Sequence, residues 1–121
     1  MRLALENDEQ FILTLHEITI LTALASGPHN RYQLVQTCAQ LTNRPPLSQG
    51  TVGPALKRLM AFRLVSRFNP PDRRPTPGRP APLYELAPNG ELVLEWEAGM
   101  LRALAGSARE YLAVLTARRQ R

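Results

Sequence analysis

The sequence predicts a mainly helical domain of the α+β type, in which three short helices precede a two-stranded hairpin and one long C-terminal helix. Three observations lead to this prediction. Apolar residues recur at helical spacing in four segments, Gly and Pro separate these segments, and two short β-type runs flank a proline-rich loop. With 44% hydrophobic and 21% charged residues in 121 positions, the chain has the composition of one folded domain.

The first helix is expected within residues 13–25, LTLHEITILTALA. One helical face, which we expect to be buried, comprises Ile18, Leu21, Thr22 and Ala25 and is widened by Leu15, Leu24 and Ile20. The Gly-Pro pair at residues 27–28 follows directly. Because glycine favours the end of a helix and proline cannot continue one, this pair predicts where the first helix stops.

Two further helices are expected before the hairpin. Asn30 predicts the N-cap of the second, over residues 31–41, and the segment TNRPP at residues 42–46 cannot continue it. Ser48 predicts the N-cap of the third. Because Pro54 has no amide hydrogen, either the third helix begins near Thr51 or its first turn is irregular. Its buried side is expected to comprise Val52, Leu56, Leu59 and Met60.

The hairpin is predicted from two β-type runs, LVSRF at residues 64–68 and LYEL at residues 83–86. In the first run, Leu64, Ser66 and Phe68 are expected on one face, and Val65 and Arg67 on the other. The loop between the runs contains six of the chain's eleven prolines. This loop is too long for a tight turn, so we expect the hairpin to project as a wing.

The last helix is expected from Pro88 almost to the end of the chain, because proline suits the first helical position. One apolar stripe comprises Leu92, Val93, Trp96 and Met100. A second, with heptad-like spacing, comprises Leu94, Leu101, Leu104, Ala108, Tyr111 and Leu115. Two apolar faces need two partners, so we expect one to pack on its own domain and the other on a second copy of the chain.

Positive charge is concentrated in the middle of the chain. Between Arg44 and Arg79 there are eight basic residues and one acidic residue, a net charge of +7, whereas the rest of the chain carries −2. An origin in a GC-rich genome would explain why fourteen of the fifteen basic residues are arginine. Such an origin does not explain the clustering. A basic block of this kind is typical of a protein that binds a polyanion such as double-stranded DNA.

The expected order of elements is that of a winged helix-turn-helix. Three segments also resemble the PadR family of bacterial transcriptional regulators, most closely its short members with a single C-terminal helix. They are LASGP at residues 24–28 with the following Tyr32, LSQGTVGPALKRL at residues 47–59, and LYELAPNG at residues 83–90. The sequence departs from the family pattern in four residues: Asn30 and Arg31 stand in place of His-Gly, Gly53 in place of a tyrosine, and Ala87 in place of a threonine.

The resemblance implies a repressor of a palindromic operator, relieved by a small aromatic or lipophilic effector or by a stress signal. The two apolar faces of the last helix predict a homodimer, and the single cysteine suits a reducing compartment, so we expect a cytoplasmic, nucleoid-associated protein. On this reading, residues 1–86 form a DNA-binding domain and residues 87–121 a dimerisation helix that uses the heptad-like stripe. The effector would contact Val93, Trp96 and Met100, although an aromatic residue at such a position is more often part of a core.

Two parts of the chain are candidates for contact with DNA. A recognition helix reads the major groove with its N-terminal residues, which gives Ser48, Gln49, Thr51 and Lys57, with Lys57 or Arg58 as a phosphate contact. Gln49 is suited to adenine, whereas the alternative for Ser48 and Thr51 is to cap the helix and touch phosphate without reading bases. The wing contributes Arg73, Arg74 and Arg79. For Lys57 and Arg58 the alternative is a solvated helix face, and for the three wing arginines it is a disordered, soluble loop. A winged-helix protein-interaction module without DNA binding is the competing function.

Other classes of function find little support in the sequence. It contains no phosphate-binding glycine loop, no nucleophile elbow and no cluster of metal-ligating residues, so we expect neither an enzyme nor a cofactor. Cys38 lies among apolar residues and is expected to be an inert core thiol. The acidic N-terminal segment does not suit a signal peptide, and no run of 18 apolar residues exists. We therefore expect no association with a membrane.

Overall fold

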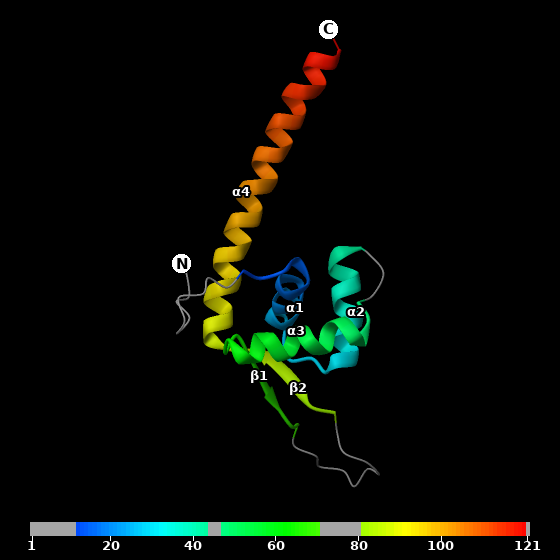
Figure 1. Cartoon of the computed structure of the whole chain (residues 1–121), viewed down its shortest axis with the longest axis vertical. Coiled ribbons are helices and arrows are strands. Elements are labelled where there is room, and N and C mark those ends of the chain that lie inside the picture. Colours follow the sequence, from blue (N-terminus) through cyan, green and yellow to red (C-terminus); the bar gives the residue numbers. More distant parts are fainter. Residues whose placement is uncertain (1–11, 44–46, 71–80, 121) are drawn as a thin grey trace.

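The computed structural model describes residues 12–43, 47–70 and 81–120. In chain order it contains α1 (Leu15–Ala25), α2 (Arg31–Thr42), α3 (Gln49–Ala61), β1 (Val65–Phe68), β2 (Leu83–Leu86) and α4 (Pro88–Arg119). Helices α1, α2 and α3 pack together, the hairpin projects at one end, and α4 extends away at the other end (Figure 1). The predicted fold class is confirmed.

Local hydrogen bonds fix where the helices begin and end. Asn30 and Ser48 cap α2 and α3 as expected, since their side chains accept from the third amide of each helix. Thr14 and Glu17 form a capping box at α1, in which each side chain accepts from the other residue's amide at 3.1 and 2.8 Å. Gly27, after α1, has a φ of 138°, a conformation that glycine adopts readily.

Helix α1 is the centre of the domain. It contacts α2, α3, α4 and β2, and its buried residues are Glu17, Ile18, Ile20, Leu21, Ala23 and Leu24. Thr22 and Ala25, which we expected on the buried face, are exposed. That prediction was wrong because the elements around α1 cover the side centred on Leu21 and Leu24, from which Thr22 is turned by about 100° or more, and Ala25 is the last residue of the helix.

The hairpin is antiparallel, with Val65 opposite Leu86 and Phe68 opposite Leu83. His29 forms an isolated antiparallel bridge beside β2. Its amide and carbonyl exchange hydrogen bonds of 3.0 and 2.8 Å with the backbone of Tyr84. The predicted alternation applies only from Val65, where the strand begins, and Leu64 and Val65 are both buried. Leu64 lies before β1, in the turn on which α4 docks, and so is not part of the pleat.

The N-terminus of α4 is held tightly against this turn. The amide of Ala87 donates to the carbonyl oxygen of Leu64 at 3.0 Å. Gly90 is buried directly behind it, where a β-carbon would overlap the Leu64 oxygen and lie 2.8 Å from Cδ1 of Leu86. Glycine is therefore required here by the close approach of two backbones.

The rest of α4 leaves the domain. Val93 is buried and Leu94 packs partly on the same core, but from Ala98 to Gln120 every residue is exposed. Trp96 and Met100 are 41% and 48% exposed, so the predicted stripe that joined them to Val93 is divided between the core and the surface. None of the described helices combines the length and apolar content needed to cross a bilayer.

Candidate nucleic-acid interface

Helix α3 presents a narrow exposed face on the side opposite its buried residues. Val52, Leu56 and Leu59 are buried. The exposed face consists of Gly50, Pro54, Lys57 and Ala61. Lys57 is therefore the one long polar side chain at the centre of this face, and the small residues around it leave room for close approach by a ligand.

The helix is regular through its proline. It begins at Gln49, not near Thr51, and Pro54 lies inside it. Because Pro54 has no amide hydrogen, the carbonyl of Gly50 has no helical donor. Gly50 is exposed, so water can bond this carbonyl, and it has no side chain to crowd the proline ring.

Ser48 and Thr51 are engaged with each other. The Thr51 amide donates to Oγ of Ser48 at 3.2 Å, and the two hydroxyl oxygens lie 3.1 Å apart. Both residues therefore have the capping role that the sequence allows as an alternative to base contact. The Ser48 side chain is exposed at the same time, so capping does not remove it from the surface.

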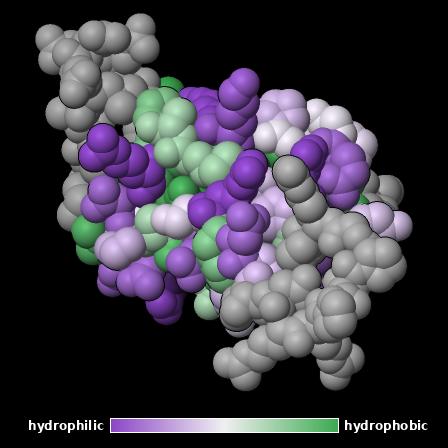
Figure 2. All heavy atoms as spheres, turned by 90° about the horizontal axis from the view of Figure 1, so that it is seen from below, coloured by the Kyte–Doolittle hydropathy of each residue, from purple (hydrophilic) through white to green (hydrophobic). Residues whose placement is uncertain are grey.

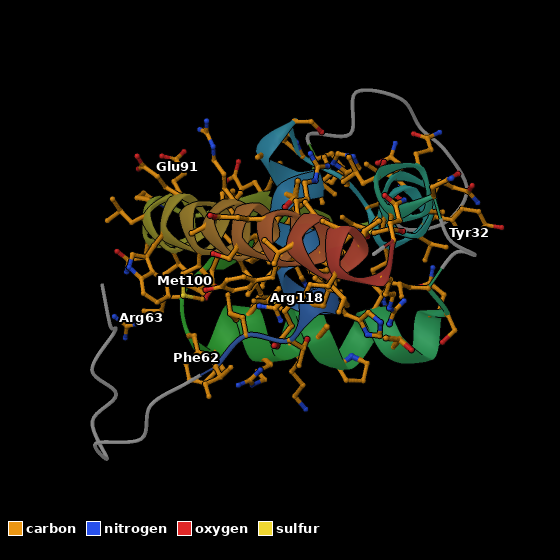
Figure 3. The ribbon with its side chains drawn as sticks, turned by 90° about the horizontal axis from the view of Figure 1, so that it is seen from above. Tyr32, Phe62, Arg63, Glu91, Met100 and Arg118 are labelled. Carbon is orange, nitrogen blue, oxygen red and sulfur yellow. The ribbon has the colours of Figure 1, made fainter. Side chains whose placement is uncertain are left out.

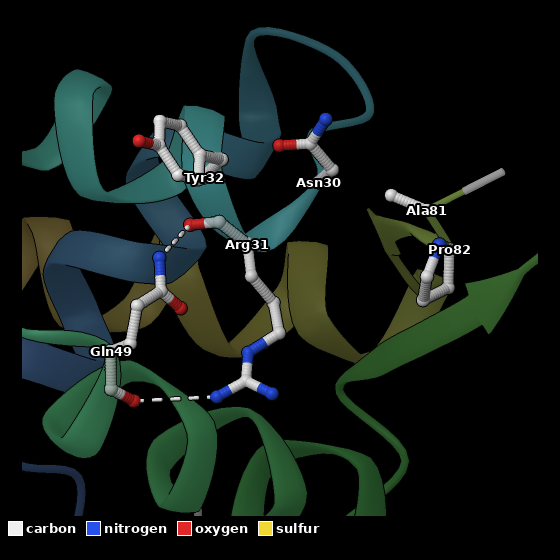
Figure 4. A pocket seen from close by; sticks show the side chains of 6 residues that line it. All are labelled: Asn30, Arg31, Tyr32, Gln49, Ala81 and Pro82. Atoms are coloured by element: carbon white, nitrogen blue, oxygen red, sulfur yellow. Dashed lines mark hydrogen bonds between the residues drawn. The ribbon is translucent and has the colours of Figure 1, made fainter. Parts of the chain in front are cut away.

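Gln49 is held by the neighbouring helix. Its Nε2 donates to the carbonyl oxygen of Arg31 at 3.3 Å, and Nη2 of Arg31 donates to the carbonyl oxygen of Gln49 at 3.3 Å (Figure 4). A bidentate contact with adenine needs the same Nε2 donor. Because this nitrogen carries two hydrogens, one is engaged with Arg31 and the other remains for a base contact.

Arg58 faces α1, away from the exposed face. It forms an ion pair with Glu17, whose side chain is 3% exposed, and Nη2 donates to the carbonyl oxygen of Ile12 at 3.1 Å. Its guanidinium also lies 5.3 Å from the ring centroid of Phe62. This placement gives Arg58 a structural role and does not support the predicted phosphate contact. The missed signal is Glu17, the single acidic residue within the apolar α1 segment.

The base of the wing lies beside the N-terminal ends of α2 and α3. An open hollow of about 360 Å³ separates them, lined by Asn30, Arg31, Tyr32, Gln49, Ala81 and Pro82 (Figure 4). Seen from the hairpin side, hydrophilic side chains predominate among the coloured residues (Figure 2). Arg73, Arg74 and Arg79 lie outside the described residues, so their predicted role stays a prediction.

Sequence reasoning missed Arg31 as a member of this surface. Its guanidinium crosses from α2 to α3 and lies over Gly53, where a β-carbon would overlap Nη2 and come within 3.2 Å of Cζ. Arg31 and Gly53 are both departures from the family pattern. The structure brings these two departures into contact, a relation that no spacing in the sequence indicates.

The comparisons with solved structures agree with this architecture. A PadR family transcription regulator from Clostridium difficile is 20% identical with a TM-score of 0.69, over 82% of this chain and 99% of that one. A PadR-like transcription factor from Bacteroides fragilis is 23% identical with a TM-score of 0.65, over 78% and 86%.

BpsR of Bordetella bronchiseptica, whose DNA binding is regulated by 6-hydroxynicotinic acid, is 26% identical with a TM-score of 0.61. The match covers 78% of this chain and 64% of that one. No protein-family model and no curated protein matches the sequence. On the strength of the structural matches, the chain has the winged-helix fold of the PadR-like transcription regulators.

Proposed function

We propose that the chain is a DNA-binding transcription regulator that acts as a homodimer. The observation that carries this proposal is the separation of charge along the fold. From residue 18 to residue 71 the sequence contains six basic residues and no acidic one, and this stretch includes α2, α3 and β1. The acidic residues of the described chain lie instead in α1, β2 and α4. The exposed end of α3 and the base of the wing therefore belong to a surface suited to the phosphates of DNA.

The exposed part of α4 supports a dimer. In Figure 3, which looks onto the C-terminal end of α4, side chains radiate from this helix on all sides. Leu104 and Tyr111 are 68% and 73% exposed, and Leu101 and Leu115 lie on the same stripe. A long helix with an uncovered apolar stripe gains most of its stability from packing. The α4 helix of a second copy would provide that packing. Gly99 and Gly106 lie about 140–160° from Leu101 around the helix axis, so they are on the side away from this apolar stripe.

A dimer of this kind suits a palindromic operator. The free part of α4 and the hairpin lie at opposite ends of the molecule (Figure 1), so contact between two α4 helices leaves both α3 faces available. Two-fold symmetric winged helices bind half-sites about one helical turn apart. The repressor role is carried over from the family resemblance.

We extend the proposal to a small aromatic effector at Trp96 and Met100. Both residues are exposed in the protomer and lie on the same side of α4 as the exposed Leu92, so they offer an apolar strip. Val93, expected to join them, is part of the core and is left out. Regulation of BpsR by 6-hydroxynicotinic acid shows that an aromatic acid serves as effector for a protein of similar fold.

The DNA-binding proposal is tested by fluorescence anisotropy on a labelled random-sequence duplex, with Lys57→Ala against Arg102→Ala. Both variants remove one positive charge, but Arg102 lies on the free part of α4. We expect Lys57→Ala to weaken binding and to reduce the salt slope by about 0.9 for each phosphate that is no longer neutralised. Arg102→Ala should behave as the parent protein. Equal behaviour of the two variants would contradict the proposed surface, and no binding by any of them would favour a protein-interaction module.

The wing is tested in the same way with Arg73→Ala, Arg74→Ala and Arg79→Ala combined. We expect weaker binding to every duplex and a flatter salt slope. Unchanged affinity would remove the wing from the interface.

The dimer is tested by analytical ultracentrifugation of Leu101→Asp/Leu104→Asp against Ala103→Asp/Ala113→Asp. Both variants add two negative charges to the exposed half of α4, the second on the side away from the stripe. We expect monomers for the first variant and dimers for the second. A dimer in both cases would place the interface on another face.

A further inference from the structure

Arg31 is a cation held between the beginnings of two helices. It is the first residue of α2, directly after the cap Asn30, and its guanidinium bonds the backbone of Gln49, the first residue of α3. The Gln49 side chain bonds back to the Arg31 carbonyl. This reciprocal pair fixes the position of the guanidinium, while the Arg31 side chain stays exposed to solvent.

Gly53 provides the space in which the guanidinium lies. A β-carbon at this position would overlap Nη2 and lie 3.2 Å from Cζ of Arg31, whereas one at Gly50 would meet only Oγ of Ser48, at 3.6 Å. Of these two glycines near the beginning of α3, Gly53 is therefore the one whose missing side chain is used by Arg31.

The two described helix beginnings that surround Arg31 carry no negative charge. The first turns of α2 and α3 contain no acidic residue, and both helix beginnings carry the positive end of the helix dipole. Within the described part of the chain, Arg31 forms no ion pair; the pair found there joins Arg58 to Glu17. A guanidinium placed against two positive helix ends is unfavourable until an anion arrives.

The location of this cation matches the path of a DNA strand. In a helix-turn-helix, the first helix of the motif crosses the phosphate backbone while the second enters the groove. Arg31 is at the exposed beginning of the first of these helices and adjoins the hollow that leads to the wing (Figure 4). The exposed face of α3 itself offers only Lys57 as a long donor, so the interface needs cations from its flanks.

We propose that Arg31 is a DNA phosphate contact and that Gly53 provides the seat that holds its guanidinium at the junction of α2 and α3. This inference rests on the proposed DNA-binding function. It assigns the contact to a residue outside the basic block, and it explains Gly53 by the space that Arg31 needs.

The test is a double-mutant cycle of Arg31→Ala and Gly53→Ala, with Gly50→Ala as the matched control and Arg31→Lys as the conservative variant. Duplex affinity is measured by fluorescence anisotropy across a salt series. For each protomer in contact, we expect Arg31→Ala to weaken binding to all sequences about 5–10-fold near 0.1 M salt and to lower the slope by about 0.9. Arg31→Lys should keep most of the slope, because the charge remains.

Gly53→Ala should weaken binding about 3-fold when Arg31 is present and have no effect in the Arg31→Ala background, which is the signature of direct coupling. Gly50→Ala should have the same effect, whatever its size, in both backgrounds. Equal effects of Gly53→Ala in both backgrounds, or no effect in either, would overturn the role of Gly53 as a seat.

Two further readouts separate a binding role from a folding role. Arg31→Ala should leave the thermal midpoint nearly unchanged, because removing positive charge from the beginning of α2 offsets the loss of the exposed hydrogen bond to Gln49. A lowered midpoint for Arg31→Ala would make the residue structural. If the parent protein binds duplex but Arg31→Ala keeps its affinity and slope, this inference fails alone; if the parent protein does not bind duplex, the proposed function fails with it.

Discussion

The contact between Gly90 and the backbone of Leu64 gives a sharp prediction for protein stability. In Gly90→Ala, the new methyl group overlaps the Leu64 carbonyl oxygen and lies 2.8 Å from Cδ1 of Leu86. The main obstacle is backbone, so no change of rotamer removes it and α4 must shift. The shift costs about 1–3 kcal/mol as overpacking and weakens the hydrogen bond from Ala87 to Leu64, worth about 1 kcal/mol. The better helix propensity of alanine returns about 1 kcal/mol.

We therefore expect Gly90→Ala to lower the free energy of unfolding by about 1–3 kcal/mol. Gly99→Ala is the matched control, because it makes the same substitution in the same helix where nothing lies within 4 Å of the new β-carbon. It should raise the free energy of unfolding by about 1 kcal/mol. Urea denaturation followed by circular dichroism, at one fixed protein concentration, measures both. Stabilisation by both substitutions would refute the close docking of α4 on the turn.

Three other predictions concern buried and capping groups. Arg58→Met should lower the free energy of unfolding by about 2–3 kcal/mol, because the buried Glu17 carboxylate then lacks its ion-pair partner. Adding Glu17→Met should recover part of this decrease in urea denaturation. Burial raises the pKa of the Cys38 thiol, which lowers its thiolate fraction at neutral pH, so alkylation should be slow in the native state and fast in urea. Rapid labelling of the folded protein would contradict this. Ser48→Asp should keep the cap of α3 and its thermal stability but weaken duplex binding by repelling phosphate, whereas Ser48→Ala should cost about 1 kcal/mol of stability.

Several boundaries of the elements were predictable because local signals set them. Asn30 and Ser48 cap their helices through hydrogen bonds to residues three positions away, and the conformation of Gly27 depends on its own backbone. Such interactions are encoded within a few residues, so the sequence alone identifies them.

The environment of α1 and the division of the α4 stripe were not predictable in this way. Thr22 shares the helical spacing of Ile18 yet is exposed, because its exposure depends on where four other elements pack. Val93 and Trp96 differ in burial because the domain ends between them along α4, and no local signal marks that point.

The candidate site was predicted in outline but not in its individual contacts. The basic block and the exposed start of α3 followed from charge and capping signals. Arg58, inside that block, is paired with Glu17, which is 41 positions away. Arg31, outside the block, is held against α3 by a hydrogen bond to the carbonyl oxygen of Gln49, which is 18 positions away. From the sequence, the role of an arginine is inferred from its neighbours along the chain, whereas in the folded protein its neighbours in space decide that role.

The central claim is that α3, the start of α2 and the wing form one cationic surface for duplex DNA. The most direct measurement is the affinity of the unmodified protein for a random-sequence duplex between 50 and 200 mM salt. Lys57 and Arg31 from two protomers give four contacts, so we expect a log–log slope of about −3.6 or steeper, with the wing adding to it. Binding whose slope lies near zero, or no binding at 50 mM salt, would contradict the claim.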